Sequence, residues 1–284
     1  MVRADAARLA CVRANTDRSA RFVFGDLVEF YDRGRPKAPA TYVEAALQRL
    51  RSGSPRRQLE VGAGTGQLTA ALVRLAPTVA LEPSPPMAER LSDNLGPEVA
   101  AGRLQVWERT FESLDASDGP FDYIWSSDAW HWLEPAVAYP LAATLLTASG
   151  LLINTWGFPA LADLGLTTAL NEVYKELNPH LVREGAPRLS VEDELFADGR
   201  DEVERSGAMI VVDAWLDHRA VVVTSEHYLD WQLSFAHTAY LAVEQRLRLR
   251  DAIASVLAQR RTELVEVLIS QYTVASAKTR MAGP

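Results

Sequence analysis

The chain has very little cysteine and no excess of positive charge. Cys11 is the single cysteine among 284 residues, so no disulfide can form within the chain, and this fits a reducing compartment. Lysine and arginine number 29 against 37 aspartates and glutamates, which gives a net charge of −8. Because nucleic-acid binding relies on basic surface, we expect no nucleic-acid partner.

Long hydrophobic runs are also missing. The most apolar window, residues 136–153, is interrupted by Pro140 and Gly150 and divides into a helix and a strand. Near the start of the chain, Arg3 and Asp5 interrupt the alanines, so the uncharged core of a signal peptide is absent. We therefore expect a cytoplasmic protein that does not enter a membrane.

Two common kinds of catalytic machinery are not indicated. No pair of histidines is spaced with a carboxylate as in known metal sites, so no metal is expected. The sequence also lacks the G-x-S-x-G turn of Ser-His-Asp hydrolases. The chemistry has to come from another motif.

That motif is the stretch QLEVGAGTGQLT at residues 58–69. An apolar run ending at Val61 meets three alternating glycines, Gly62, Gly64 and Gly66, and an apolar helical pattern follows at once. This order is typical of a strand, a tight turn and a helix. Glycines let the backbone turn sharply and let a ligand lie against bare peptide.

The next strand, residues 78–82, indicates which ligand. It ends in Glu82, at about the distance from Gly62 where nucleoside-binding folds place the acceptor for ribose hydroxyls. The dinucleotide fingerprint fails, because its third glycine falls on Gln67, and Glu60 beside the turn would repel a pyrophosphate. S-adenosylmethionine, with a ribose, an ammonium group and a sulfonium, suits this arrangement.

Strand and helix patterns alternate along the chain. This predicts an α/β fold: a doubly wound, Rossmann-like, mostly parallel seven-stranded sheet with an N-terminal helical lid and a helical cap insertion. The expected strands are residues 58–61, 78–82, 103–107, 121–125, 150–156, 208–215 (with 219–223) and 265–276. We expect a lid at 1–50, a cofactor-binding core at 51–157 and 207–284, and a cap over the substrate site at 158–206.

Four further segments carry a family resemblance. They are YDRGRP at residues 31–36, LEPSPPM at 81–87, TFE at 110–112 and SDAWHW at 127–132. With the glycine turn, they resemble class I S-adenosylmethionine-dependent methyltransferases, in the small-molecule group that includes trans-aconitate methyltransferases. The segment ASG at 148–150 departs from that group's Pro-Gly-Gly turn.

The resemblance implies roles for the cofactor site. Glu82 would accept both ribose hydroxyls, Glu60 would orient the ammonium group, and Met87 and Phe111 would enclose the adenine. For Arg35, the sequence favours neither of two alternatives: contact with the methionyl carboxylate, or a solvated position on the surface. The full set of expected cofactor contacts is Tyr31, Arg35, Glu60, Gly62, Ala63, Gly64, Gly66, Glu82, Pro83, Met87, Thr110, Phe111, Glu112 and Ser126.

The sequence gives fewer indications of the residues that contact the methyl acceptor. His131, just past the fourth strand, is the candidate general base, with a bracing role for its helix as the alternative. Trp125, Trp130, Trp132 and Trp156 lie near two adjacent strand ends. We expect at least two of these tryptophans to belong to the core, and Trp130, Trp132 and Trp156 are candidates for an aromatic substrate wall.

We therefore expect methyl transfer from S-adenosylmethionine, leaving S-adenosylhomocysteine, to an oxygen, nitrogen or carbon of a small, apolar or aromatic metabolite of a specialised biosynthetic pathway. A carboxylate acceptor, with Arg183 or Arg188 as clamps, is one alternative. A cofactor binder that does not methylate and a nicotinamide-dependent oxidoreductase are others. Monomer and homodimer are not distinguished.

Overall fold

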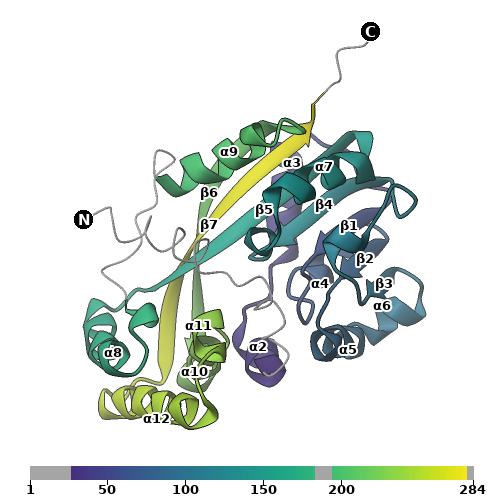
Figure 1. Cartoon of the computed structure of the whole chain (residues 1–284). Helices are drawn as coiled ribbons and strands as arrows, with labels where there is room; N and C mark the ends of the chain where they lie inside the picture. The colour runs from purple at the N-terminus through teal and green to yellow at the C-terminus, as the bar shows by residue number, and fades with distance from the viewer. Residues whose placement is uncertain (1–26, 183–193, 280–284) are drawn as a thin grey trace.

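The computed structural model describes residues 27–182 and 194–279. Its centre is one seven-stranded sheet in the order β3-β2-β1-β4-β5-β7-β6 (Figure 1). The strands are β1 Gln58–Val61, β2 Thr78–Leu81, β3 Leu104–Trp107, β4 Phe121–Ser127, β5 Leu146–Leu161, β6 Met209–Thr224 and β7 Leu264–Lys278.

The sheet is parallel from β3 to β5, and β7 runs antiparallel to both of its neighbours. The predicted doubly wound, mostly parallel sheet is confirmed. The last three strands are longer than expected: β5 starts at Leu146 and continues to Leu161, and residues 209–224 form one strand where the sequence suggested two.

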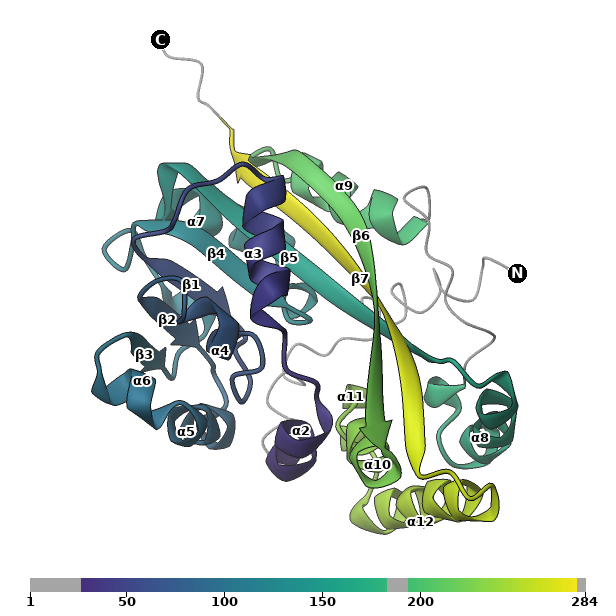
Figure 2. The same cartoon turned by 180° about the vertical axis from the view of Figure 1, so that it is seen from behind.

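Helices cover both faces of the sheet. Helices α7 (Pro135–Leu145) and α9 (Glu194–Arg205) lie on the face seen in Figure 1, and α3 (Ala40–Arg49) lies on the opposite face, which Figure 2 shows. The short helix α4 (Thr69–Leu72) packs beside α3. Two further helices, α5 (Pro85–Asn94) and α6 (Gly96–Ala100), lie next to β3.

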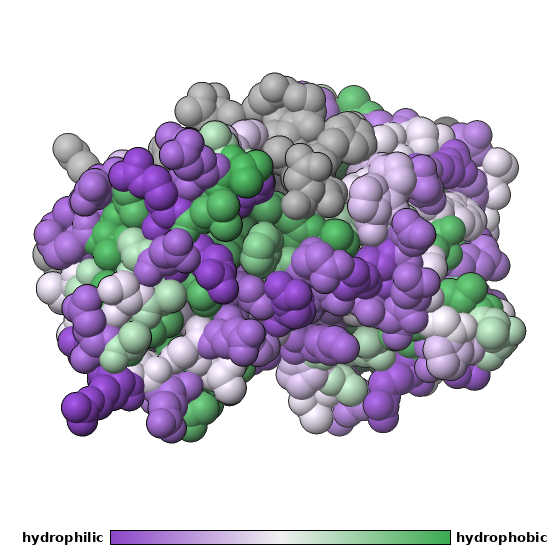
Figure 3. Space-filling model, turned by 90° about the horizontal axis from the view of Figure 1, so that it is seen from below, coloured by the Kyte–Doolittle hydropathy of each residue, from purple (hydrophilic) through white to green (hydrophobic). Residues whose placement is uncertain are grey.

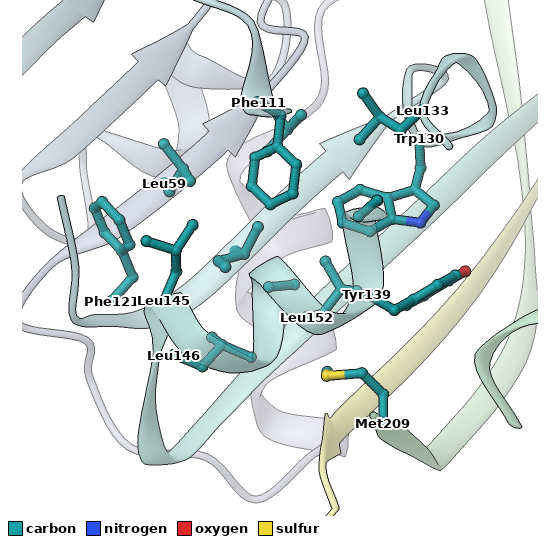
Figure 4. Packing of buried hydrophobic residues seen from close by; sticks show 14 of the residues in the cluster. Leu59, Phe111, Phe121, Trp130, Leu133, Tyr139, Leu145, Leu146, Leu152 and Met209 are labelled. Carbon is teal, nitrogen blue, oxygen red and sulfur yellow. The ribbon is translucent and has the colours of Figure 1, made fainter. Parts of the chain in front are cut away.

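Strand β1 shows why the chain folds in this way. Its side chains alternate between the two faces, as in any strand. Leu59 and Val61 join the core under α7, whereas Gln58 donates a hydrogen bond to the carbonyl of Leu72 in α4 at 2.7 Å. Figure 4 shows the core on the α7 side, where Leu59, Leu145 and Leu152 lie close together.

The long halves of β5, β6 and β7 carry a second group of helices, called here the helical lobe: α8 (Leu164–Leu177), α10 (Ser225–Leu233), α11 (Ala236–Ala239) and α12 (Val243–Gln259) (Figures 1 and 2). The predicted cap at 158–206 is therefore divided. Its first helix, α8, packs with α12, and its last helix, α9, packs on β6 and β7 at the other end of the strands.

The segment before the sheet packs against this lobe. Helix α2 (Val28–Gly34) contacts α10, where Arg33 forms an ion pair with Asp230 at 2.8 Å. His227 lies with its Nε2 at 3.1 Å from the carbonyl oxygen of Gly34. A Cβ on Gly34 would lie only 2.4 Å from the backbone of Asp230 and Trp231. The close approach of α2 and α10 thus requires glycine at position 34.

The surface is mixed in character. Seen from below, hydrophilic residues surround separate patches of hydrophobic ones (Figure 3). Scattered exposed apolar residues of this kind are normal on protein surfaces. Among the described residues, no helix combines the length and the apolar character needed to cross a membrane.

The packing at Gly34 gives a first prediction. Gly34→Ala should lower the free energy of unfolding by about 1–3 kcal/mol, because the added methyl group forces two packed backbones apart. Urea unfolding measures this change. Gly53→Ala is the matched control, since a Cβ there meets nothing within 4 Å, and we expect a change within about 0.5 kcal/mol. Equal effects of the two substitutions would contradict the packing described.

Candidate active site

A cleft opens at the carboxyl ends of β1, β2 and β4, where ligands bind in open α/β sheets. It has two adjoining compartments, which share part of their lining. The first compartment contains Glu82, and the second extends toward β5, β6 and β7. Residues lining both compartments form the junction: Tyr31, Arg35, Gly62, Ser127 and Asp128.

Glu82 ends β2 and is buried in the first compartment. One carboxylate oxygen accepts the backbone N–H of Gly64 and the other accepts that of Ser84, each at 2.9 Å. Burial raises the pKa of Glu82, and the two N–H groups act in the opposite direction. The carboxylate is therefore held between β2 and the glycine turn by two backbone donors.

The walls of this compartment are apolar. Met87 from α5 and Phe111 from the 3-10 helix η2 (Phe111–Ser113) both line it, and so does Trp132. Thr110 adds a polar group beside Phe111. Apolar walls with one carboxylate suit a flat ring attached to a group that carries hydroxyls.

The turn after β1 depends on its glycines. Gly62 has φ +71°, and a Cβ there would lie 2.4 Å from the Cβ of Ala129. Gly64 has φ +58°, and a Cβ there would lie 3.1 Å from the ring of Tyr31. A side chain at position 62 would collide with Ala129, and one at position 64 would have a strained backbone and press on the ring of Tyr31.

Glu60 lies just before this turn and lines the second compartment. It is 2% exposed, and the hydroxyl of Thr69 donates to it at 2.6 Å. Burial raises the pKa of Glu60 to about 8; the Thr69 hydrogen bond lowers it and the negative charge of Glu82 raises it further. Glu60 is thus mostly protonated at neutral pH unless a cation lies beside it.

Asp128 stands at the junction, in a left-handed backbone conformation with φ +52°. Its Oδ1 accepts the backbone N–H of Gly157 at 2.9 Å. Burial raises its pKa, while Arg35, the Gly157 hydrogen bond and Arg219 act against that rise. Its Oδ2 makes no hydrogen bond within residues 27–182 and 194–279. One carboxylate oxygen is therefore available to a ligand.

Arg35 is not a solvated surface charge. Its Nε donates to the hydroxyl of Ser234 at 2.9 Å, and its guanidinium lies over the ring of Phe235 at 4.5 Å and over that of Tyr31 at 5.3 Å. These contacts fix the charge at the junction, at hydrogen-bonding distance from the helical lobe.

The structure brings twelve of the predicted residues to the cleft: Tyr31, Arg35, Glu60, Gly62, Ala63, Gly64, Glu82, Pro83, Met87, Thr110, Phe111 and Trp132. Gly66, Glu112 and Ser126 are next to lining residues without lining the cleft themselves. The hydroxyl of Ser126 instead donates to the carbonyl of Val61 at 3.2 Å. Its neighbours Ser127 and Asp128 take the place expected for it.

Two of the tryptophans considered for the acceptor wall belong to the core, as we expected of at least two of those near these strand ends, and Trp132 lines the first compartment. Trp130 is 2% exposed and packs at 5.4 Å from both Phe111 and Tyr139 in the core under α7 (Figure 4). Trp156 stacks on Tyr272, with ring centroids 5.6 Å apart, in the same core. Both indoles therefore belong to the hydrophobic core and not to the lining of the cleft.

The candidate general base does not line the cleft. His131 lies on the 3-10 helix η3 (Trp130–Trp132) beside Trp132 and is half-buried, and it is not among the lining residues. Arg183 and Arg188 lie outside the described residues. Within the part of the chain that the structure covers, no three His, Cys, Asp or Glu side chains are grouped as metal ligands.

The far wall of the second compartment was missed by sequence reasoning. It consists of Tyr42 from α3, Gly157 from β5, Arg219 from β6, Trp231 from α10 and Gln271 from β7. These residues belong to no local motif. The pairing of the three long strands brings Gly157, Arg219 and Gln271 together, and the helices α3 and α10 add Tyr42 and Trp231.

Part of the chain is similar to known methyltransferases. Residues 59–154 match a family model described as a methyltransferase domain. An uncharacterised methyltransferase of Mycobacterium tuberculosis is 36% identical over 140 residues, which are 49% of this chain and 54% of that protein. A malonyl-[acyl-carrier protein] O-methyltransferase of Herminiimonas arsenicoxydans is 31% identical over 147 residues, or 51% of this chain and 53% of that protein.

The matching region spans about half the length of these curated relatives. Among solved structures, a putative type II methyltransferase from Anaeromyxobacter dehalogenans superposes with a TM-score of 0.59 at 11% identity, covering 86% of this chain and 97% of that one. At this identity the superposition shows a shared fold.

The raised pKa of Glu60 gives a second prediction. Between pH 4.5 and about 8 the folded protein holds a proton on Glu60 that the unfolded chain has lost, so this group makes the free energy of unfolding fall as pH rises. Glu60→Gln keeps an acceptor for Thr69 and removes the titration. Its stability relative to the parent should increase by more than about 1 kcal/mol from pH 5 to pH 9.

Urea unfolding at the two pH values measures the difference. Glu89→Gln removes the same charge from an exposed position on α5 and should give no such pH-dependent gain. If Glu60→Gln behaved like Glu89→Gln, the burial of Glu60 would be wrong.

Proposed function

We propose that this chain, in which residues 59–154 form a domain of the class I S-adenosylmethionine-dependent methyltransferase fold, transfers a methyl group from S-adenosylmethionine to a small molecule. The observation that carries the proposal is the first compartment. There the carboxylate of Glu82 faces the glycine turn between the apolar walls formed by Met87 and Phe111.

Each part of the cofactor has a chemically suitable neighbour. The two oxygens of Glu82 would accept the two ribose hydroxyls, and the adenine would lie between Met87 and Phe111 with Thr110 at its edge. The methionyl ammonium would approach Glu60, and the carboxylate would meet the guanidinium of Arg35.

Gln67 supports this orientation. It lines the second compartment, its Nε2 donates to the hydroxyl of Thr65 at 2.7 Å, and its buried Oε1 has no hydrogen-bond partner among the described residues. A buried acceptor without a partner is costly, so a donor such as an ammonium group would satisfy it. Glu60 and Gln67 together form an acceptor pair for a cation.

When bound, S-adenosylmethionine supplies a methyl group on a positively charged sulfur. The chain has to hold the acceptor in line with that bond and keep water away, and such positioning alone lowers the barrier substantially. The junction residues Tyr31 and Asp128 lie between the two compartments and would orient the acceptor there.

Where the acceptor must lose a proton, we infer that Asp128 accepts it. Its Oδ1 is held by the N–H of Gly157, its Oδ2 has no such contact with the described residues, and it borders both compartments. His131 remains the alternative base on the neighbouring turn.

The second compartment supports a polar acceptor more than the aromatic one expected from the sequence. Trp130 and Trp156 belong to the core, whereas Tyr42, Arg219 and Gln271 line this compartment. The acceptor is therefore proposed to be a small metabolite with polar groups.

The third prediction tests the cofactor site. Glu82→Ala should weaken binding of S-adenosylhomocysteine at least tenfold, because two hydroxyl donors lose a charged acceptor. Calorimetric titration measures the affinity, and Glu89→Ala on the exposed side of α5 should leave it unchanged. NADH should not bind to the parent protein. Tight NADH binding, or unchanged affinity in Glu82→Ala, would overturn the proposal.

The fourth prediction separates the two candidate bases, with an acceptor found by screening. Asp128→Asn should lower kcat about a hundredfold, and His131→Ala less than tenfold, while both keep the affinity for S-adenosylhomocysteine within about threefold. Steady-state rates at saturating cofactor measure the effect. The opposite ranking would assign the proton transfer to His131.

A further inference from the structure

Arg219 lies near the middle of β6 and lines only the second compartment. In the antiparallel register it stands opposite Ile269 of β7, which in turn stands opposite Pro159 of β5. Residues directly opposite in antiparallel strands share a face of the sheet. Arg219 therefore projects on the same side as Ile269 and Pro159, which both line the compartment.

The guanidinium of Arg219 is half-buried and makes no hydrogen bond or ion pair with residues 27–182 or 194–279. Asp128 and Tyr42 influence it electrostatically, and burial lowers its pKa. A guanidinium carries five N–H donors, and burying them without acceptors is unfavourable. Arg219 is thus a partly desolvated cation that faces the cleft.

The neighbouring polar side chains already satisfy one another. The hydroxyl of Thr155 receives hydrogen bonds from Tyr42 at 2.9 Å and from Gln271 at 2.6 Å, and Tyr42 also lies 2.7 Å from the hydroxyl of Thr273. Burial raises the pKa of Tyr42 to about 12, so it stays neutral. This closed network leaves Arg219 as the group that needs an acceptor.

A second donor lies in the same compartment. Trp231 of α10 is 2% exposed, lines the compartment, and its indole N–H has no acceptor among the described residues. A buried indole N–H usually finds a partner. Arg219 comes from β6 and Trp231 from α10. Two separate elements therefore each bring a hydrogen-bond donor without an acceptor among the described residues to the second compartment.

We propose that the second compartment binds a carboxylate group of the acceptor through Arg219, with the indole N–H of Trp231 as a second donor. This inference rests on the proposed function and names the class of acceptor. Planar, bidentate hydrogen bonding makes a guanidinium well suited to a carboxylate.

Asp128 favours a carboxylate over a phosphate. Its carboxylate borders the same compartment and already interacts with Arg219. A carboxylate carries one negative charge, whereas a phosphate monoester carries nearly two at neutral pH and would be repelled more strongly. Glycine at position 157 leaves room beside Asp128, since a Cβ there would lie 3.6 Å from its Oδ2 and from Gln271.

The test uses the full chain saturated with S-adenosylhomocysteine and small probes in matched pairs: benzoate with benzamide, and butyrate with butyramide. NMR titration follows the indole N–H signal of Trp231, assigned by its loss in Trp231→Phe. We expect each acid to bind at least tenfold more tightly than its amide, and the difference to fall below threefold in Arg219→Gln.

Two further variants complete the design. Arg248→Gln removes the same charge from an exposed position on α12 and should keep the full preference for acids. Arg219→Lys keeps the charge without the planar donor pair and should keep part of that preference. Unchanged affinity for S-adenosylhomocysteine shows that each variant is folded.

The outcomes are distinguishable. The inference is overturned if the parent does not prefer acids, or if the preference survives in Arg219→Gln. In either case, binding of S-adenosylhomocysteine to the parent still supports the proposed function. Tighter binding of phenyl phosphate than of benzoate overturns the choice of a carboxylate. Failure of S-adenosylhomocysteine to bind the parent rejects the proposed function, whatever the acids do.

Discussion

The site depends on one steric constraint, the contact between the turn after β1 and the loop after β4. Gly62 lies so close to Ala129 that no side chain fits between them. This contact holds the two loops together at the carboxyl edge of the sheet. In the same turn, the backbone N–H of Gly64 donates a hydrogen bond to Glu82. In the loop after β4, Asp128 directly precedes Ala129 and lines both compartments.

The electrostatics of the cleft follow from that close packing. Three carboxyl groups, Glu60, Glu82 and Asp128, lie where burial raises the pKa of each. Such an arrangement reduces stability in the empty protein, and it is typical of sites that recognise a positively charged ligand. Arg35 lies at the junction and Arg219 in the second compartment, and the positive charges of both oppose the rise in the pKa of Asp128.

Local motifs were predictable from the sequence, and long-range pairing was not. The glycine turn and Glu82 are encoded within 25 residues, so their spacing alone indicated the first compartment. The sequence indicated that some of the tryptophans near the strand ends belong to the core but not which ones, because a tryptophan at a strand end can face either the cleft or the core. The role of Arg219 depends on the register of β6 against β7, which no stretch of sequence specifies.

The docking of α2 on α10 connects the lining of the cleft to the packing of the helical lobe. Tyr31 and Arg35, which belong to or directly follow α2, line both compartments, whereas Trp231 of α10 lines the second. Arg35 also donates to Ser234 at the end of α10. A ligand that contacts Tyr31 and Arg35 only while α2 is docked on α10 would stabilise that docking by its binding free energy.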